Sequence, residues 1–440
     1  MKFHAPWEKA FQRIATPFEH FIHAQTTAGL VLIVATILAL VFANTSIVDT
    51  YTHFIHINIT FNIGEWKISH TVHHWINDGL MAIFFFMVGL EIKREILIGE
   101  LSSIKVATLP ILSAIGGMIL PALIYTIVND GGNGANGWGV PMATDIAFAI
   151  SALVLLGNRV SPALVTFLVA LAIVDDLGAV LVIAIFYTNE INMLALSLAG
   201  ISFATMIALN RFGVRVILPY FIVGLFLWFF MLESGVHATI AGVLAAMTIP
   251  SKPKVAPLTF TSSIKNLLDE YNNYPIATDN VIHDKQKGIL RNIQDKIDEV
   301  GSPATKLERD LHLPVGLLII PIFALVNAGI TLDLSSLGDS LSSPISLGII
   351  SGLILGKVIG IAGIAWLAIK FGIATLPANS TMKQIFGVSF LGGIGFTMSI
   401  FVADLAFSGN SLFIYQAKVG ILFASLISGL TGYFWLKYVK

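Results

Sequence analysis

Two adjacent acids, Asp175 and Asp176, lie in the middle of residues 163–187, a stretch that is otherwise uncharged. A carboxylate at the centre of a bilayer costs about 2.5–3.5 kcal/mol on insertion scales, so it is rarely kept for packing alone. Two like charges this close cannot both ionise freely, so we expect at least one to hold a proton near neutral pH unless a cation lies between them. Such a pair is suited to exchanging protons for metal ions.

Other polar residues lie inside apolar stretches. Thr144 and Asp145 follow Pro141, and the glycine-rich run 393–399 occupies the middle of another stretch. Proline and glycine at membrane depth favour broken helices, which are tolerated where the backbone is buried in protein or lines a cavity. Lys357 is the only basic residue deep inside an apolar stretch, and a buried lysine deprotonates or needs an anionic partner. The aspartates are available partners.

Two of these residues have plainer interpretations that the sequence leaves open. Asp145 could serve only to balance the positive N-terminal ends of broken helices. Lys357 could face helix C-terminal carbonyls as a fixed counter-charge rather than carry a proton.

The composition indicates what surrounds these residues. Hydrophobic residues make up 56% of the 440 and charged residues only 12%, and the mean hydropathy is +0.84, values that exclude an ordinary soluble protein. The net charge of −1 gives no reason to expect a nucleic-acid partner. The chain has no cysteine, which excludes disulfides, iron–sulfur clusters and thiolate metal sites. We expect a polytopic membrane protein with no cofactor, and a transporter rather than an enzyme.

Apolar runs of about 17–25 residues, long enough to cross a bilayer as helices, recur along the chain. They predict an all-α polytopic membrane protein with twelve transmembrane helices. The expected spans are 26–45, 75–97, 107–128, 139–157, 163–187, 192–210, 216–232, 235–250, 314–332, 344–370, 383–407 and 415–437.

The lysines and arginines support this count and indicate its orientation. If residues 1–25 are cytoplasmic, almost all of the 25 basic residues fall in cytoplasmic segments; Lys67 and Lys418 fall outside and Lys357 within the bilayer. This bias follows the positive-inside rule and places both termini in the cytoplasm. The chain then divides into residues 1–25, spans one to eight at 26–250, a cytoplasmic insertion at 251–313, and spans nine to twelve at 314–440.

Two segments outside the membrane stand out. Residues 52–70 alternate polar and apolar side chains around Asn62–Gly64, which predicts a small extracytoplasmic β-hairpin. Its open edges favour a homodimer, although the hairpin could also lie on its own membrane domain. The 251–313 insertion is polar and lysine-rich, and it could regulate activity or simply be a tolerated long loop.

The breaks at Thr144–Asp145 and 393–399 have a symmetric placement. Each lies in the middle member of three spans, three to five and ten to twelve. The breaks lie in spans four and eleven, which are an odd number of spans apart, so the halves cross the membrane in opposite senses. Inverted repeats with paired broken helices hold ions near the midplane of secondary transporters.

Five short motifs occur along the chain: Ala143–Ala149, Leu171–Ala179, Ser234–Gly242, Leu355–Lys357 and Gly393–Phe401. In this order they resemble motifs of the NhaA-type bacterial sodium/proton antiporters, a family known for inverted repeats. The resemblance covers nearly the whole chain.

The resemblance implies an inner-membrane homodimer joined through the 52–70 hairpin, exchanging cytoplasmic Na⁺ or Li⁺ for external protons. It implies that Asp176 binds the cation, that Asp175 can pair with Lys357, and that Thr144 and Asp145 lie beside the site. It also suggests residues of a cytoplasmic funnel and pH response. These are Asp78, Glu91, Glu95, His237, Glu308 and His312. His237 could equally be a packing histidine, and Glu91 and Glu95 could form ordinary ion pairs.

Competition for one carboxylate would couple the two ions. Deprotonated Asp176 offers the oxygen ligands that a hard cation prefers, whereas the protonated acid does not. A second titrating group, either Asp175 or Lys357, would make the exchange electrogenic. The rival classes fit less well: an intramembrane aspartyl protease needs acids on separate helices, and a channel does not need buried acids. A proton-coupled transporter of an organic solute is the strongest competitor, but the residues around the acids are apolar.

Overall fold

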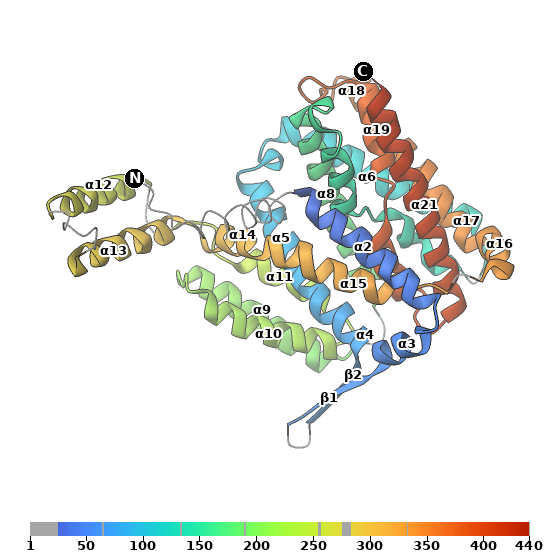
Figure 1. Ribbon diagram of the computed structural model, residues 1–440, viewed down its shortest axis with the longest axis horizontal. Helices are drawn as coiled ribbons and strands as arrows, with labels where there is room; N and C mark the ends of the chain where they lie inside the picture. The colour runs from blue at the N-terminus through green and yellow to red at the C-terminus, as the bar shows by residue number, and fades with distance from the viewer. Residues whose placement is uncertain are drawn as a thin grey trace, which may run out of the picture.

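The computed structural model describes residues 25–63, 66–132, 134–188, 191–253, 257–274, 283–331 and 333–439. Most of the predicted N-terminal segment 1–25, part of the 251–313 insertion and Gly64 of the predicted hairpin turn lie outside these residues. Helices dominate the described part of the chain (Figure 1).

The first half of the chain contains helices α2 to α11 and the two strands. Their bounds are α2 Gln25–Ala43, α3 Val48–His56, β1 Asn58–Ile63, β2 Trp66–Thr71, α4 Val72–His74, α5 Met81–Leu97, α6 Ile104–Val128, α7 Ile146–Val154, α8 Pro162–Phe186, α9 Met193–Arg211, α10 Ile217–Glu233 and α11 Thr239–Thr248. The later helices are α12 Pro257–Asn272, α13 Asp284–Val300, α14 Pro303–Pro314, α15 Ile320–Asn327, α16 Leu334–Ser342, α17 Pro344–Ser351, α18 Ile364–Lys370, α19 Met382–Leu391, α20 Phe396–Ala406 and α21 Ser411–Tyr438. Short 3₁₀ helices cover Glu100–Ser102, Ala135–Met142 and Gly157–Arg159, and π-helical turns cover Trp75–Leu80, Val315–Ile319, Gly352–Gly356 and Ile359–Gly363.

Each of the twelve predicted spans contains helix. By length and composition, seven helical runs among the described residues could cross a membrane, or nine if each of two bent pairs counts as one span. α10 and α11 have 17 and 10 residues and are shorter than those runs. The count of twelve therefore stays a prediction.

The helix that carries the two acids begins and ends cleanly. Pro162 stands at its first turn, where its missing N–H leaves no hydrogen bond unmade, and the Ser161 hydroxyl accepts the N–H of Leu164 at 3.2 Å. α8 then runs without interruption to Phe186. Asp175 and Asp176 lie near its midpoint, fully buried.

The two predicted breaks are present as interruptions of helix. Residues 143–145 are not helical and separate the 3₁₀ helix Ala135–Met142 from α7. Residues 392–395 separate α19 from α20, and these two helices meet at a bend of 49°. A side chain at Gly393 would collide with the Leu353 carbonyl, so glycine there permits the close approach of two backbones.

The β-hairpin predicted over residues 52–70 has shorter strands than expected. β1 and β2 pair antiparallel, with Asn58 opposite Thr71 and Ile63 opposite Trp66. Residues 52–56, which the alternation placed in the hairpin, lie in α3 instead. α3 turns away from α2 by 111° and is amphipathic, with Ile55 buried, so its apolar spacing satisfied a helical period as well.

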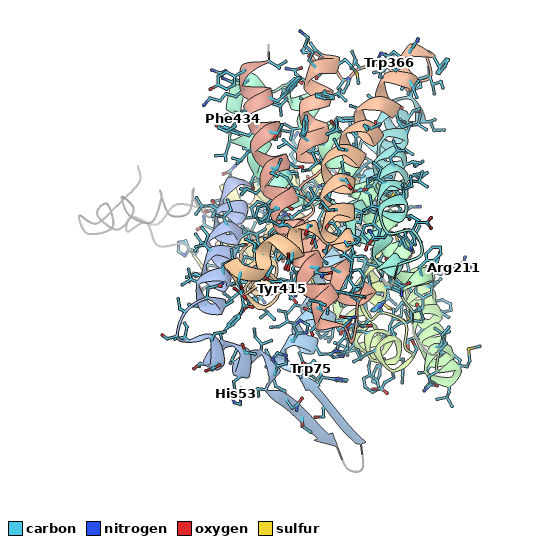
Figure 2. All side chains as sticks on the ribbon, turned by 90° about the vertical axis from the view of Figure 1, so that its right-hand side faces the viewer. His53, Trp75, Arg211, Trp366, Tyr415 and Phe434 are labelled. Atoms are coloured by element: carbon cyan, nitrogen blue, oxygen red, sulfur yellow. The ribbon has the colours of Figure 1, made fainter. Side chains whose placement is uncertain are left out.

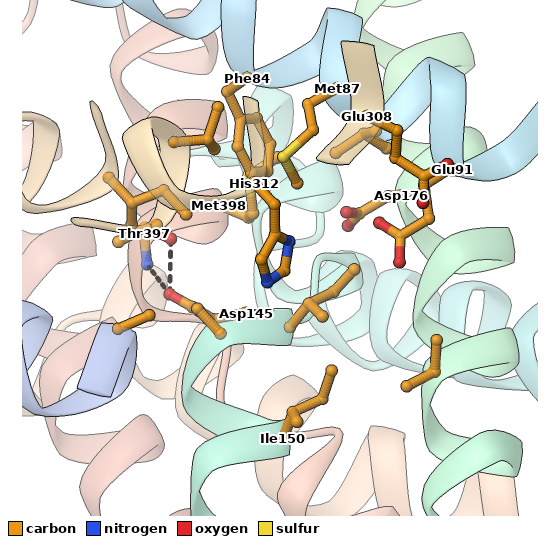
Figure 3. Close-up of a pocket in the computed structure, with 18 of the residues that line it drawn as sticks. Phe84, Met87, Glu91, Asp145, Ile150, Asp176, Glu308, His312, Thr397 and Met398 are labelled. Atoms are coloured by element: carbon orange, nitrogen blue, oxygen red, sulfur yellow. Dashed lines mark hydrogen bonds between the residues drawn. The ribbon is translucent and has the colours of Figure 1, made fainter. Parts of the chain in front are cut away.

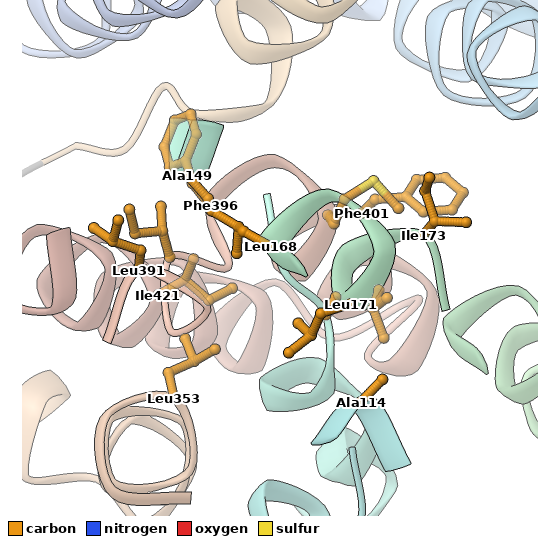
Figure 4. Close-up of a cluster of buried hydrophobic side chains, with 14 of the residues drawn as sticks. Ala114, Ala149, Leu168, Leu171, Ile173, Leu353, Leu391, Phe396, Phe401 and Ile421 are labelled. Carbon is orange, nitrogen blue, oxygen red and sulfur yellow. The ribbon is translucent and has the colours of Figure 1, made fainter. Parts of the chain in front are cut away.

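Two apolar cores hold the helices together. The larger joins α2, α5 to α8, α15 and α17 to α21; Figure 4 shows Leu168 and Leu171 of α8 near Phe396 and Phe401 of α20. The smaller joins α9, α10 and α11 to one face of α5. Large apolar side chains remain exposed along α2, α9 and α10, as expected for surfaces that contact lipid. α12 and α13 project away from both cores (Figure 1).

Candidate functional site

The two interrupted helices meet at their breaks. The Asp145 N–H donates to the Ile394 carbonyl at 2.6 Å, and the Thr144 hydroxyl donates to the Gly392 carbonyl at 2.8 Å. These bonds join residues about 250 positions apart in sequence. They use backbone groups that the broken helices leave without helical partners, which would otherwise be costly to bury.

Asp145 accepts hydrogen bonds from the first turns of both following helices. Its Oδ1 accepts the Phe148 N–H at 3.1 Å, which makes it the N-cap of α7. Its Oδ2 accepts the backbone N–H of Thr397 at 3.0 Å, in the first turn of α20, and also the Thr397 hydroxyl (Figure 3). A carboxylate between two helix N-termini is stabilised by the partial positive charge at both.

Asp175 faces a buried cation. Lys357 Nζ donates to Asp175 Oδ2 at 2.7 Å, and neither side chain is exposed. The same ammonium donates to the Thr144 hydroxyl at 3.0 Å and to the Met142 carbonyl. The lysine therefore joins α8 to the first break, and its three donors all have acceptors.

Asp176 has a different environment. Both of its carboxylate oxygens are buried without a hydrogen-bond partner, and it lines a cavity of about 430 Å³. Asp145 and Thr397 line the same cavity on its other side (Figure 3). Adjacent side chains on a helix point about 100° apart, so one acid reaches Lys357 while its neighbour faces the cavity.

Further charged and titratable residues line the same cavity. Arg94 near the end of α5 donates to Glu308 of α14 at 2.6 Å and to Glu95 at 2.8 Å. Glu91 and His312 also line the cavity; in Figure 3 Glu91 lies beside Asp176, and His312 lies between Asp176 and Asp145. Four of the six suggested funnel residues therefore line one cavity, and Arg94 lines it with them. The four are Glu91, Glu95, Glu308 and His312.

The other two suggested residues, Asp78 and His237, do not line the cavity. Asp78 lies in the π-helical turn before α5, where its carboxylate is 3.3 Å from His74 Nδ1. The His237 Nε2 atom hydrogen-bonds with the Tyr187 carbonyl at 2.9 Å, where α8 ends.

The fold brings two further residues to these acids, Thr397 and Arg94, which are not among the predicted site residues. Thr397 lies in the motif Gly393–Phe401, and its place just after the second break is the sequence signal that points to it. Arg94 lies near the end of a predicted span, where a basic residue is ordinary, so no sequence signal distinguishes it. Within the described residues, no group of three or more His, Asp or Glu side chains could hold a resident metal ion.

Comparison with known proteins gives this geometry a context. The sequence matches the family model described as Na⁺/H⁺ antiporter 1 over residues 19–436. It is 64% identical over 439 residues to the Na(+)/H(+) antiporter NhaA of Sulfurimonas denitrificans, covering 100% of this chain and 99% of that protein. It is 48% identical over 431 residues to Na(+)/H(+) antiporter NhaA 1 of Saccharophagus degradans, covering 98% of this chain and 93% of that protein. It is 46% identical over 435 residues to the Na(+)/H(+) antiporter NhaA of Dichelobacter nodosus, covering 99% of this chain and 94% of that protein.

Proposed function

The chain belongs to the Na⁺/H⁺ antiporter family, and we propose that it exports cytoplasmic Na⁺ or Li⁺ in exchange for external protons by alternating access. The observation that carries this proposal is Asp176, whose two buried oxygens face the cavity without a hydrogen-bond partner. A carboxylate in that position binds either a cation or a proton, and each excludes the other.

Exchange becomes obligatory if the helices rock only when Asp176 is occupied. The cation approaches through the cavity, past the acids Glu91, Glu95 and Glu308, which raise its local concentration. One repeat then rocks against the other around the site where the two breaks cross, as transporters of this architecture do. A proton then takes the place of the cation after the site faces outward.

A second group makes the exchange electrogenic. When Asp176 binds the cation, the pair of Asp175 and Lys357 rearranges and releases a second proton, from either the lysine or the acid. Thr144 and Asp145 hold the breaks in register during this step, since they join the two repeats at 2.8 Å and 2.6 Å.

The distribution of lysines and arginines supports one orientation of the chain in the membrane. The segments rich in lysine and arginine face the cytoplasm of a bacterial inner membrane, with both termini inside.

The β1–β2 pair has two open edges, which we propose are covered by a second copy of the chain in a homodimer. Light scattering in detergent should give the mass of two chains, falling to one when a glycine–serine loop replaces the two strands.

Everted membrane vesicles test the transport proposal directly. After respiration acidifies their interior, adding NaCl or LiCl should restore the fluorescence of a trapped pH dye, whereas KCl and organic solutes should not. A response only to an organic solute would overturn the proposal and identify a proton-coupled solute transporter. Vesicles without the protein provide the baseline.

A further inference from the structure

A second cluster of charged residues lies at the end of the molecule opposite the cavity. Asp404, near the end of α20, has a side chain only 9% exposed, and its Oδ1 is 3.1 Å from Lys418 Nζ of α21. Its Oδ2 has no hydrogen-bond partner and lies 3.8 Å from His73 Nε2 of α4. Asp404 is not among the residues predicted from the sequence, although an acid near the end of a predicted span is a signal that could indicate it.

Several features place this cluster on the extracytoplasmic face. His73 lies in α4, which follows β2 and precedes most of the predicted span 75–97, and Lys418 is one of the few basic residues assigned to that side. In Figure 2, His53 and Trp75 lie beside the strands, whereas Trp366 and Phe434 lie at the other end, near Lys370 and Lys437. The cavity, which Thr397 and Met398 line, and this cluster therefore lie at opposite ends of α20.

In its neutral form, His73 has a partner other than Asp404. The Asn77 side-chain amide is 3.4 Å from His73 Nε2, which can accept its hydrogen only when that nitrogen carries no proton. Asn77 is held in turn by Asn327 of α15, through amide hydrogen bonds of 2.8 Å and 3.3 Å. Protonation turns Nε2 into a donor, repels the Asn77 amide and attracts the free oxygen of Asp404.

Some groups around His73 lower its pKa and others raise it. Burial lowers the pKa of His73 most strongly, and Lys418 and the imidazole of His56 lower it further. Asp404 and the hydrogen bond with Asn327 raise it. The balance leaves the pKa of His73 below its ordinary value, so protonation requires an acidic external medium.

We propose that His73, Asp404 and Lys418 form an external proton-binding latch, which closes when His73 takes up a proton and pairs with Asp404. Closure ties the outer end of α20 to the start of the helix that carries Glu91. Because the first turn of α20 contacts Asp145 through Thr397, a fixed outer end of α20 opposes the rocking of the breaks and keeps the cavity open toward the cytoplasm. The latch rests on the proposed antiport, and it would limit proton influx when the outside is acidic.

Substitutions at His73 should move transport in opposite directions. His73→Gln cannot gain a charge and should leave the latch open, whereas His73→Arg is always charged and should hold it closed. Right-side-out vesicles loaded with radioactive Na⁺ allow external pH to be varied from about 8 to about 5.5 at constant internal pH, across the titration range of histidine. The effect of pH on the driving force is common to all variants and cancels in their ratios.

We expect the wild-type rate relative to His73→Gln to fall about twofold to tenfold over this range, as expected for one partly buried ion pair. His73→Arg should be slow at every external pH, and Asp404→Asn should behave like His73→Gln. His53, an exposed histidine of α3, provides a matched control, since His53→Gln should follow the wild type.

The outcomes separate this proposal from the antiport itself. If the wild type and His73→Gln respond identically to external pH, or if His73→Arg follows the wild type, the latch is wrong. Should His73→Arg fail to insert, Asp404→Asn decides alone, and a wild-type response in that variant overturns the latch. If no variant, including the wild type, moves Na⁺ at any pH, the proposed function fails first.

The absence of cysteine from the chain permits a second test. The double variant His73→Cys with Asp404→Cys, treated with a short reducible bifunctional thiol reagent, should lose transport and regain it on reduction. Each single variant should be unaffected by the reagent. Full transport by the cross-linked protein would show that α4 and α20 do not need to separate, which contradicts the latch.

Discussion

Lys357 Nζ lies 2.7 Å from Asp175 Oδ2, inside a protein region where neither side chain contacts solvent. Because of this contact, the two adjacent acids have different environments. Asp175 is paired with the Lys357 ammonium in this conformation, whereas Asp176 faces the cavity with both oxygens free. The acid that can bind and release a cation is therefore the one whose carboxylate has no side-chain partner here.

Breaking the buried pair should destabilise the protein. Lys357→Met leaves Asp175 without its cation and should reduce the free energy of unfolding by about 3–5 kcal/mol, the usual effect of removing one partner of a buried ion pair. Transport should be lost as well. Thermal unfolding in detergent measures the first effect, and dye dequenching in everted vesicles measures the second.

The matched double variant distinguishes pairing from mere packing. Lys357→Met combined with Asp175→Leu removes both charges and should recover most of the lost stability, because no uncompensated charge remains buried. Equal destabilisation by the single and the double variant would contradict the pairing.

Replacing the cation-binding acid should abolish exchange. Asp176→Asn keeps the shape of the side chain, but an amide neither takes up nor releases a proton in this pH range. We expect no dequenching with NaCl or LiCl and a melting temperature close to that of the wild type. Asp295→Asn, at an exposed carboxylate of α13, is the control and should retain full activity. Normal exchange by a correctly inserted Asp176→Asn protein would remove the basis of the mechanism.

Loss of the hydrogen bond between the Thr397 hydroxyl and Asp145 should reduce stability and Na⁺ affinity moderately. Thr397→Val removes the hydroxyl donor but keeps the backbone N–H bond of 3.0 Å, so stability should fall by about 1–3 kcal/mol. Because the contact joins the two breaks, the Na⁺ concentration for half-maximal dequenching should rise. Thr397→Ser restores the hydroxyl and should restore both values; failure to do so would indicate that the methyl group, rather than the hydroxyl, is important.

Activity should rise as the cytoplasmic side becomes more alkaline. A cation that displaces one proton from Asp176 loses apparent affinity at low pH, up to about tenfold for each pH unit. The half-maximal Na⁺ concentration, measured by dequenching at a series of pH values, should therefore fall as pH rises. A half-maximal concentration independent of pH would mean that Na⁺ and the proton do not compete.

Amide variants of Glu91, Glu95 and Glu308 test whether a separate sensor exists. If these acids control access to the cavity, their substitution should shift the midpoint of the pH profile without changing the Na⁺ dependence at its optimum. An unchanged profile in these variants, together with a shifted one in Asp176→Glu, would leave competition at Asp176 as the whole explanation.

The sequence alone identified most residues of the candidate site. Charged groups are so costly in a bilayer that Asp175, Asp176 and Lys357 stand out in the linear sequence, and helix-breaking residues mark both interruptions. Hydrophobic runs indicated where helices lie, because spanning a bilayer requires length and apolarity rather than a particular neighbour. The segment 52–56 was assigned wrongly because a short stretch can satisfy a period of two and a helical period together.

The distinction between the two acids required the folded molecule. Helical geometry separates Asp175 and Asp176 by about 100°, but it does not say which one faces a lysine that is 182 residues away. The double capping by Asp145, the Arg94 bridge between Glu95 and Glu308, and the proximity of His73 to Asp404 depend in the same way on contacts between distant segments. Such contacts are determined by how the helices cross, which depends on the close packing of many small and apolar side chains at once.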